Sequence, residues 1–113
     1  MDTDDKQFLL TTAWLFAKHG QGWRARILLE ALMEVNAGDG VVAAMLAQLL
    51  LDEGKAQEAL AAVRSCEFPP ELQRAGALLE TRALRLLGRN EEADARWSRF
   101  LKASRGEHRE WIS

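Results

Sequence analysis

The sequence predicts an all-α fold in which three helix-turn-helix repeats stack into a right-handed superhelix. The first observation is a glycine that returns every 34 residues, with an alanine five residues after each one. The glycines are Gly20, Gly54 and Gly88, and the alanines are Ala25, Ala59 and Ala93. The second observation is that larger apolar residues keep the same spacing: Phe16, Leu50 and Leu84 before the glycine, and Leu29, Val63 and Trp97 after the alanine.

A period of about 34 residues is typical of tetratricopeptide (TPR) repeats, in which a helix A and a helix B form one unit. We expect the glycine to end helix A in the left-handed conformation. The small alanine would then let helix B approach helix A closely. At 113 residues the chain forms one domain, with repeats at about 6–39, 40–73 and 74–107.

The apolar runs predict six helices, and capping residues support their boundaries. The expected helices span residues 5–19, 23–36, 41–53, 56–65, 71–87 and 91–104. The polar and acidic residues 1–5 suit the start of the first helix. Asp39 is expected to cap the third helix, and Pro70 suits the first turn of the fifth. A further period of 34 residues places Trp111 at an apolar position, so residues 107–113 are expected to form a short capping segment.

Composition excludes several classes of function. The net charge of -2 and the pI near 5.7 do not suit a nucleic-acid-binding domain. A single cysteine excludes an internal disulfide and favours a reducing compartment. The sequence shows neither a signal peptide nor an apolar run of about 20 residues that could span a membrane. We therefore expect a cytoplasmic protein.

The sequence holds no pattern of residues that predicts catalysis, a metal site or a cofactor. His19 lies where a cation is favourable at a helix end, and His108 has no potential metal ligand near it. Cys66 is in register with Leu32 and Phe100, which predicts a small buried apolar residue. We therefore expect no enzyme activity, no cofactor and no metal.

The first helix of each TPR unit lines a concave groove, which is the expected binding surface. The groove residues predicted from the register are Gln7, Leu10, Trp14 and Lys18 in the first unit, Val41, Ala44, Gln48 and Leu51 in the second, and Leu78, Arg82 and Arg85 in the third. The groove is thus apolar in two units and arginine-bearing in the third, which disfavours a clamp for a C-terminal carboxylate. We expect it to bind an apolar or amphipathic segment of a protein partner. Burial in the core is the alternative for Leu10 and Leu51.

Trp23 lies outside this groove, just inside the second helix. It is expected on the convex side or at the turn. There it either packs against the loop of the next unit or forms a second contact point.

Residues 6–36, KQFLLTTAWLFAKHGQGWRARILLEALMEVN, resemble the small TPR chaperones of bacterial type III secretion, most closely the YscY (SctY) family. The shared features are a polar start, a Leu-Leu pair, an apolar stretch with a tryptophan, a glycine turn and the pattern R-A-x-x-L-L-x-A-L. Length and the three-repeat layout agree over the whole chain, and close similarity covers the first repeat. Ala37 replaces the usual proline after the second helix, and Gly22 adds a second glycine to the turn.

The resemblance implies a virulence-linked chaperone in the bacterial cytoplasm. Such a chaperone binds and stabilises a small early-secreted partner, an SctX/YscX-like protein, and the pair contacts the export gate of the injectisome. Needle-subunit chaperones of the YscG kind and translocator chaperones of the SycD kind are alternatives, as is a TPR scaffold that joins two folded proteins. A chaperone is expected to behave poorly or to self-associate through its groove, for example as a homodimer, when its partner is absent, whereas a scaffold is expected to be a well-behaved monomer.

Overall fold

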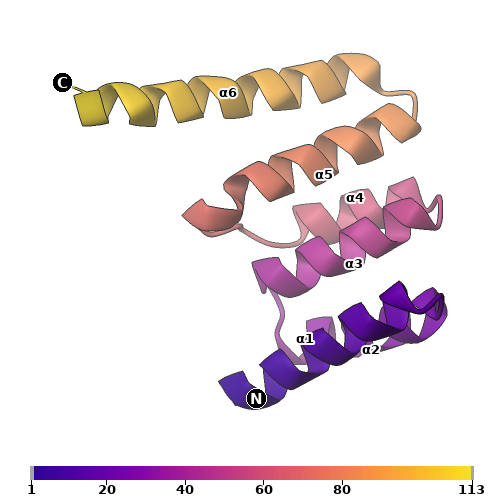
Figure 1. Cartoon of the computed structure of the whole chain (residues 1–113). Coiled ribbons are helices and arrows are strands. Elements are labelled where there is room, and N and C mark those ends of the chain that lie inside the picture. The colour runs from indigo at the N-terminus through magenta and orange to yellow at the C-terminus, as the bar shows by residue number, and fades with distance from the viewer. Residues whose placement is uncertain (1, 113) are drawn as a thin grey trace.

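The computed structural model describes residues 2–112, and side chains for residues 2–106. Over these residues the chain is helical and contains no strand, which confirms the all-α prediction. The helices are α1 (Thr3–Lys18), α2 (Gly22–Val35), α3 (Gly40–Asp52), α4 (Ala56–Arg64), α5 (Gln73–Leu86) and α6 (Asn90–Ile112), and a 3₁₀ turn, η1 (Pro70–Leu72), precedes α5 (Figure 1).

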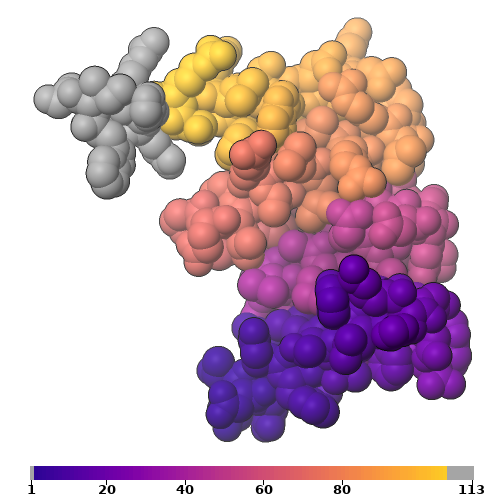
Figure 2. Space-filling model, viewed as in Figure 1, coloured from indigo at the N-terminus to yellow at the C-terminus, as the bar shows by residue number. Residues whose placement is uncertain are grey.

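Consecutive helices form antiparallel pairs that follow one another in chain order. Helix α1 packs against α2, α3 against α4, and α5 against α6. Each pair contacts the next through the packing of α2 on α3 and of α4 on α5 (Figure 1). In the space-filling view the colours accordingly lie in layers, from indigo at one end of the molecule through magenta to orange and yellow at the other (Figure 2).

The glycines spaced by 34 residues form equivalent turns. Gly20, Gly54 and Gly88 follow α1, α3 and α5, and their φ angles are 74°, 78° and 76°. This left-handed conformation is easily reached only without a Cβ, so glycine is favoured there. The predicted turns are confirmed, and the alanines that follow them, Ala25, Ala59 and Ala93, are fully buried.

Asp39 caps α3, as predicted, and also links α3 to α1. Its Oδ1 accepts hydrogen bonds from the backbone amides of Val41 at 2.9 Å and Val42 at 3.2 Å. Its second carboxylate oxygen forms an ion pair with Lys6 of α1. Desolvation alone would raise the pKa of Asp39, but the hydrogen bonds from Lys6 and Val42 outweigh it and lower the pKa below the usual value.

The predicted end of the last helix was wrong. A helix end near residue 104 and a separate segment from residue 107 were expected, but α6 continues to Ile112. The chain between them, Ser-Arg-Gly-Glu, contains no proline, and its single glycine, Gly106, costs a helix only about 1 kcal/mol. The 34-residue period thus predicted a turn at a place where the residues do not encode one. Trp111 and His108 lie outside the residues whose side chains are described.

Two leucines expected in the groove lie in the core instead. Leu10 is 7% exposed and Leu51 is 5% exposed. Leu10 lies about one helical turn from Lys6, whose ion pair with Asp39 holds this end of α1 against the start of α3. Leu51 lies about 90° around the α3 axis from the row of residues that faces the groove. The alternative of core burial is therefore correct for both leucines.

Candidate partner-binding groove

An apolar groove of about 450 Å³ lies across α1, α3 and α5. Helix α3 packs directly on α5, whereas α1 and α3 approach each other less closely. Two residues of α2 therefore help to line the space between them. The lining residues are Ala13, Trp14 and Ala17 of α1, Ala25 and Leu29 of α2, Ala44, Met45, Gln48, Leu49 and Asp52 of α3, and Ala75, Leu78, Leu79 and Arg82 of α5.

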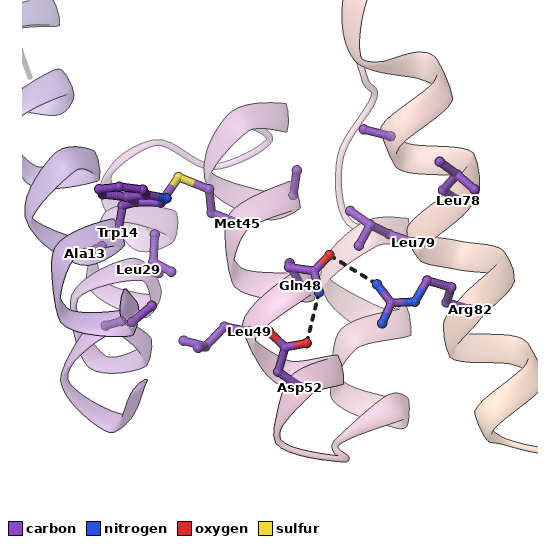
Figure 3. A pocket seen from close by; sticks show the side chains of 14 residues that line it. Ala13, Trp14, Leu29, Met45, Gln48, Leu49, Asp52, Leu78, Leu79 and Arg82 are labelled. Carbon is purple, nitrogen blue, oxygen red and sulfur yellow. Dashed lines mark hydrogen bonds between the residues drawn. The ribbon is translucent and has the colours of Figure 1, made fainter. Parts of the chain in front are cut away.

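Large apolar side chains on both sides of the groove are open to solvent. Trp14 on α1 is 51% exposed and Leu78 on α5 is 40% exposed. Figure 3 shows Trp14 and Met45 of α3 pointing toward one another. Because alanines line much of the remaining wall, the groove has room for side chains that come from outside.

A short hydrogen-bonded chain forms the polar edge of the groove. The guanidinium of Arg82 donates to Gln48 Oε1 at 3.2 Å, and Gln48 Nε2 donates to Asp52 Oδ1 at 3.0 Å (Figure 3). Among the side chains of residues 2–106, no carboxylate forms an ion pair with Arg82. The Arg82 charge is therefore available to an acidic group outside the chain.

A second cation lies beside the tryptophan. Lys18 Nζ lies 5.1 Å from the centre of the Trp14 ring, within the range of a cation–π interaction. Together with Arg82 it places positive charge at two separate edges of a mainly apolar groove, whose other polar lining residues are Gln48 and Asp52.

The structure brings together only part of the predicted groove. Trp14, Ala44, Gln48, Leu78 and Arg82 line it. Lys18 lies beside it, over the Trp14 ring. Gln7 and Val41 are exposed but lie outside it, nearer the starts of α1 and α3. Arg85 is turned away and forms an ion pair with Asp94 of α6 at 2.7 Å. Leu10 and Leu51 lie in the core, as described above.

Sequence reasoning missed several residues of the groove. Met45 and Leu49 form a row with a spacing of four residues beside Ala44, Gln48 and Asp52, so a wider stripe on α3 would have included them. Ala25 and Leu29 carried no such signal, because they lie on α2, a helix expected outside the groove. Ala25 and Leu29 reach the groove lining because α1 and α3 are separated.

Trp23 is more than half exposed, and the Arg24 guanidinium lies 5.0 Å from the centre of its ring. This exposure does not favour packing of Trp23 against the loop of the next helix pair.

A second, more polar cavity of about 340 Å³ lies between α4, α5 and α6. Glu80 there accepts hydrogen bonds from Arg96 at 2.7 Å and Arg64 at 3.0 Å. Desolvation alone would raise the pKa of Glu80, but the bonds from Arg96 and Arg64 outweigh it and lower the pKa. Because Glu80 neutralises part of the surrounding charge, we assign this cluster a structural role.

Cys66 lines the same cavity and is half-buried, not enclosed as predicted. Its thiol donates a long hydrogen bond of 3.7 Å to the Val63 carbonyl. Burial, and then the charge of Asp39, raise the pKa of the Cys66 thiol, so the neutral form is favoured. Within the described part of the chain, no three His, Cys, Asp or Glu residues form a group that could hold a metal ion.

The structure thus defines an all-helical protein with a solvent-open apolar groove. No protein-family profile and no curated protein matches the chain. Over the described residues, none of the helices combines the length and the apolar character needed to cross a bilayer.

Proposed function

We propose that the chain is a three-repeat TPR protein that binds a segment of a protein partner. Three observations support the TPR assignment. The glycines have equivalent left-handed φ angles, the alanines five residues later are buried, and the helix pairs pack in chain order. In such an array the first helices of the units line the binding surface, and here α1, α3 and α5 line the groove.

The groove is the observation on which this proposal depends. Its walls are apolar, and both Trp14 and Leu78 are open to solvent. An exposed apolar surface with a polar rim, here Lys18, Gln48 and Arg82, is typical of a protein-binding site. We infer that the partner segment is amphipathic, with an apolar row that contacts Trp14 and Leu78 and an acidic side chain that meets Arg82.

The resemblance of residues 6–36 to the YscY family indicates which partner the protein binds. On this basis the protein is a type III secretion chaperone in the bacterial cytoplasm. It would bind and stabilise an SctX/YscX-like secreted protein and deliver it to the export gate of the injectisome. Burial of the partner's apolar segment stabilises both proteins by about 25 cal/mol per Å² of apolar area.

Co-purification with a tagged SctX/YscX-like protein from the same genome tests the proposal. Trp14→Glu and Leu78→Glu place a charge in the groove at exposed positions, so they should abolish co-purification while the helical circular dichroism signal is retained. Leu86→Glu is the matched control, because Leu86 is 61% exposed and lies outside the groove. Leu51→Glu is unsuitable, since it would unfold the core.

Retention of the partner by both folded groove variants would rule out the groove as the binding site. Failure of the wild type to bind the SctX/YscX-like protein would exclude the YscY assignment. If the wild type instead binds a needle subunit, a translocator or two folded proteins, the corresponding alternative replaces it.

A further inference from the structure

Two large apolar residues on α1 occupy positions that are covered in the later helix pairs. Phe8 is 71% exposed and Leu15 is 44% exposed. The residues 34 positions later, Val42 and Leu49, are buried in α3. The residues another 34 positions on, Gly76 and Ala83, are buried in α5. This face of α1, which we call the leading face, therefore lacks the cover that the same face of α3 and α5 has.

At Leu49 the cover comes from α2, the second helix of the preceding pair, and at Gly76 it comes from Phe68 in the linker after α4. Helix α2 packs on α3, and Leu49 Cδ1 lies 3.5 Å from the position that a Cβ at Gly22 would take. Helix α4 packs on α5 in the same way. The leading face of α1 is therefore shaped to accept a helix that runs antiparallel to it, as α2 runs to α3.

The ion pairs that a second helix makes across the internal junctions carry their charges in the same order. At the first junction, Arg26 of α2 forms an ion pair at 3.3 Å with Glu53, the residue that follows α3. At the second, Arg64 of α4 pairs with Glu80 of α5 at 3.0 Å. In both, the cation lies on the second helix of one pair and the carboxylate belongs to the first helix of the next pair or to its cap.

Helix α6 presents the matching surface at the other end of the molecule. Trp97 is half-buried, whereas its equivalents Leu29 and Val63 are buried. Trp97, Leu101 and Arg105 are spaced by four residues, so they form a row along α6. Helix α6 runs without a break to Ile112, so within residues 2–112 no later helix packs over this row. We call it the trailing face.

The two faces carry opposite charge. Asp4 and Asp5 lie in the first turn of α1, one turn before Phe8. Lys102 and Arg105 are exposed on the second half of α6. None of these four side chains forms an ion pair with another side chain in residues 2–106.

We propose that the trailing face of one copy packs on the leading face of a second copy, so that copies associate head to tail. Shifted by whole periods, the contacts between Gly22 and Leu49 and between Arg64 and Glu80 become contacts of Asn90 with Leu15 and of Ser98 with Thr12 of the second copy. The residues that follow on α6, Leu101 and Arg105, would then lie along the first half of α1, near Phe8 and the acidic first turn. The cation again comes from the second helix and the carboxylate from the first. Because the leading and trailing faces differ, the contact is heterologous. Each complex keeps one free face of each kind, so further copies can bind. This inference does not rest on the proposed partner of the groove.

Sedimentation equilibrium of the full chain at low ionic strength tests the proposal. The average mass should rise with concentration without levelling off at twice the monomer mass, and added salt should lower it. Phe8→Glu should weaken association by about tenfold or more, as for an apolar residue at an interface centre. Leu86→Glu should have no effect, because Leu86 is also exposed but lies away from both faces.

Charge reversal separates this arrangement from other modes of association. Asp4→Lys with Asp5→Lys reverses the leading face, and Lys102→Glu with Arg105→Glu reverses the trailing face. Each double variant alone should be monomeric, and an equimolar mixture of the two should associate again. A wild type that is monomeric at every concentration, a closed dimer, or association that survives either reversal would overturn the proposal.

Discussion

Arg82 donates a hydrogen bond to Gln48 across the groove at 3.2 Å, and the two residues are one 34-residue period apart. The residue one period earlier, Trp14, lines the same groove. One position of the repeat therefore carries an indole, an amide and a guanidinium in succession. The three equivalent side chains all line the groove, but their chemical groups differ.

Arg82 is expected to select for acidic partner segments. Arg82→Glu should lower the affinity for the partner by about tenfold, because the reversed charge repels the acidic side chain that Arg82 is proposed to meet. The loss should shrink as ionic strength rises. Fluorescence anisotropy of a labelled partner segment at two salt concentrations measures both effects.

Arg85→Glu is the matched control for this prediction. Arg85 lies on the same helix and is similarly exposed, but it pairs with Asp94 outside the groove. Equal losses from the two variants would show that α5 contributes only general positive charge to binding.

Glu80 is expected to make the fold sensitive to acid. Its pKa is lowered in the folded state by Arg96 and Arg64, so the ionised form stabilises the fold above the unfolded value of about 4.3. That stabilisation is lost as the pH falls through the folded pKa. Glu80→Gln should cost about 1–2 kcal/mol near pH 7 and much less at about pH 3.

Urea denaturation of the wild type and Glu80→Gln at both pH values measures this difference. Glu92→Gln is the control, because Glu92 pairs with Arg89 at the surface and its loss should change the free energy of unfolding little. A Glu80→Gln deficit that is the same at both pH values would show that burial and shape, not charge, account for the effect.

Two glycine-to-alanine substitutions are expected to change stability in opposite directions. Gly54→Ala should destabilise the fold by about 1 kcal/mol, because φ is 78° and a Cβ is strained there. Gly106→Ala should stabilise it by about 0.5–1 kcal/mol, because Gly106 lies inside α6 and a Cβ would meet no other atom. Thermal unfolding followed by circular dichroism measures both changes. A neutral Gly54→Ala would contradict the role given to the left-handed turn.

The fold was largely predictable because its main determinants are local. A left-handed glycine, a buried alanine five residues later and an N-cap aspartate each act within a few residues, and each is confirmed at Gly54, Ala59 and Asp39. The end of α6 was not predictable from the period, because a period states where a turn would fall but not whether the residues there can form one.

The groove was less predictable because it depends on how far neighbouring helices separate. Trp14, Gln48 and Arg82 followed from the register alone. Leu10 has the same register position as Ala44 and Leu78, yet only the latter two line the groove. Leu10 lies one helical turn from Lys6, whose ion pair with Asp39 links this end of α1 to the start of α3, and such a contact between distant residues is not visible in the repeat.

The order of tryptophan, glutamine and arginine across α1, α3 and α5 gives the groove a direction. Had all three units carried the same residue, a bound segment could lie in either orientation with nearly the same contacts. Here a reversed segment would move its acidic side chain away from Arg82, to the end of the groove where Lys18 lies over the indole of Trp14. The groove therefore distinguishes a partner segment from the same side chains in the opposite order.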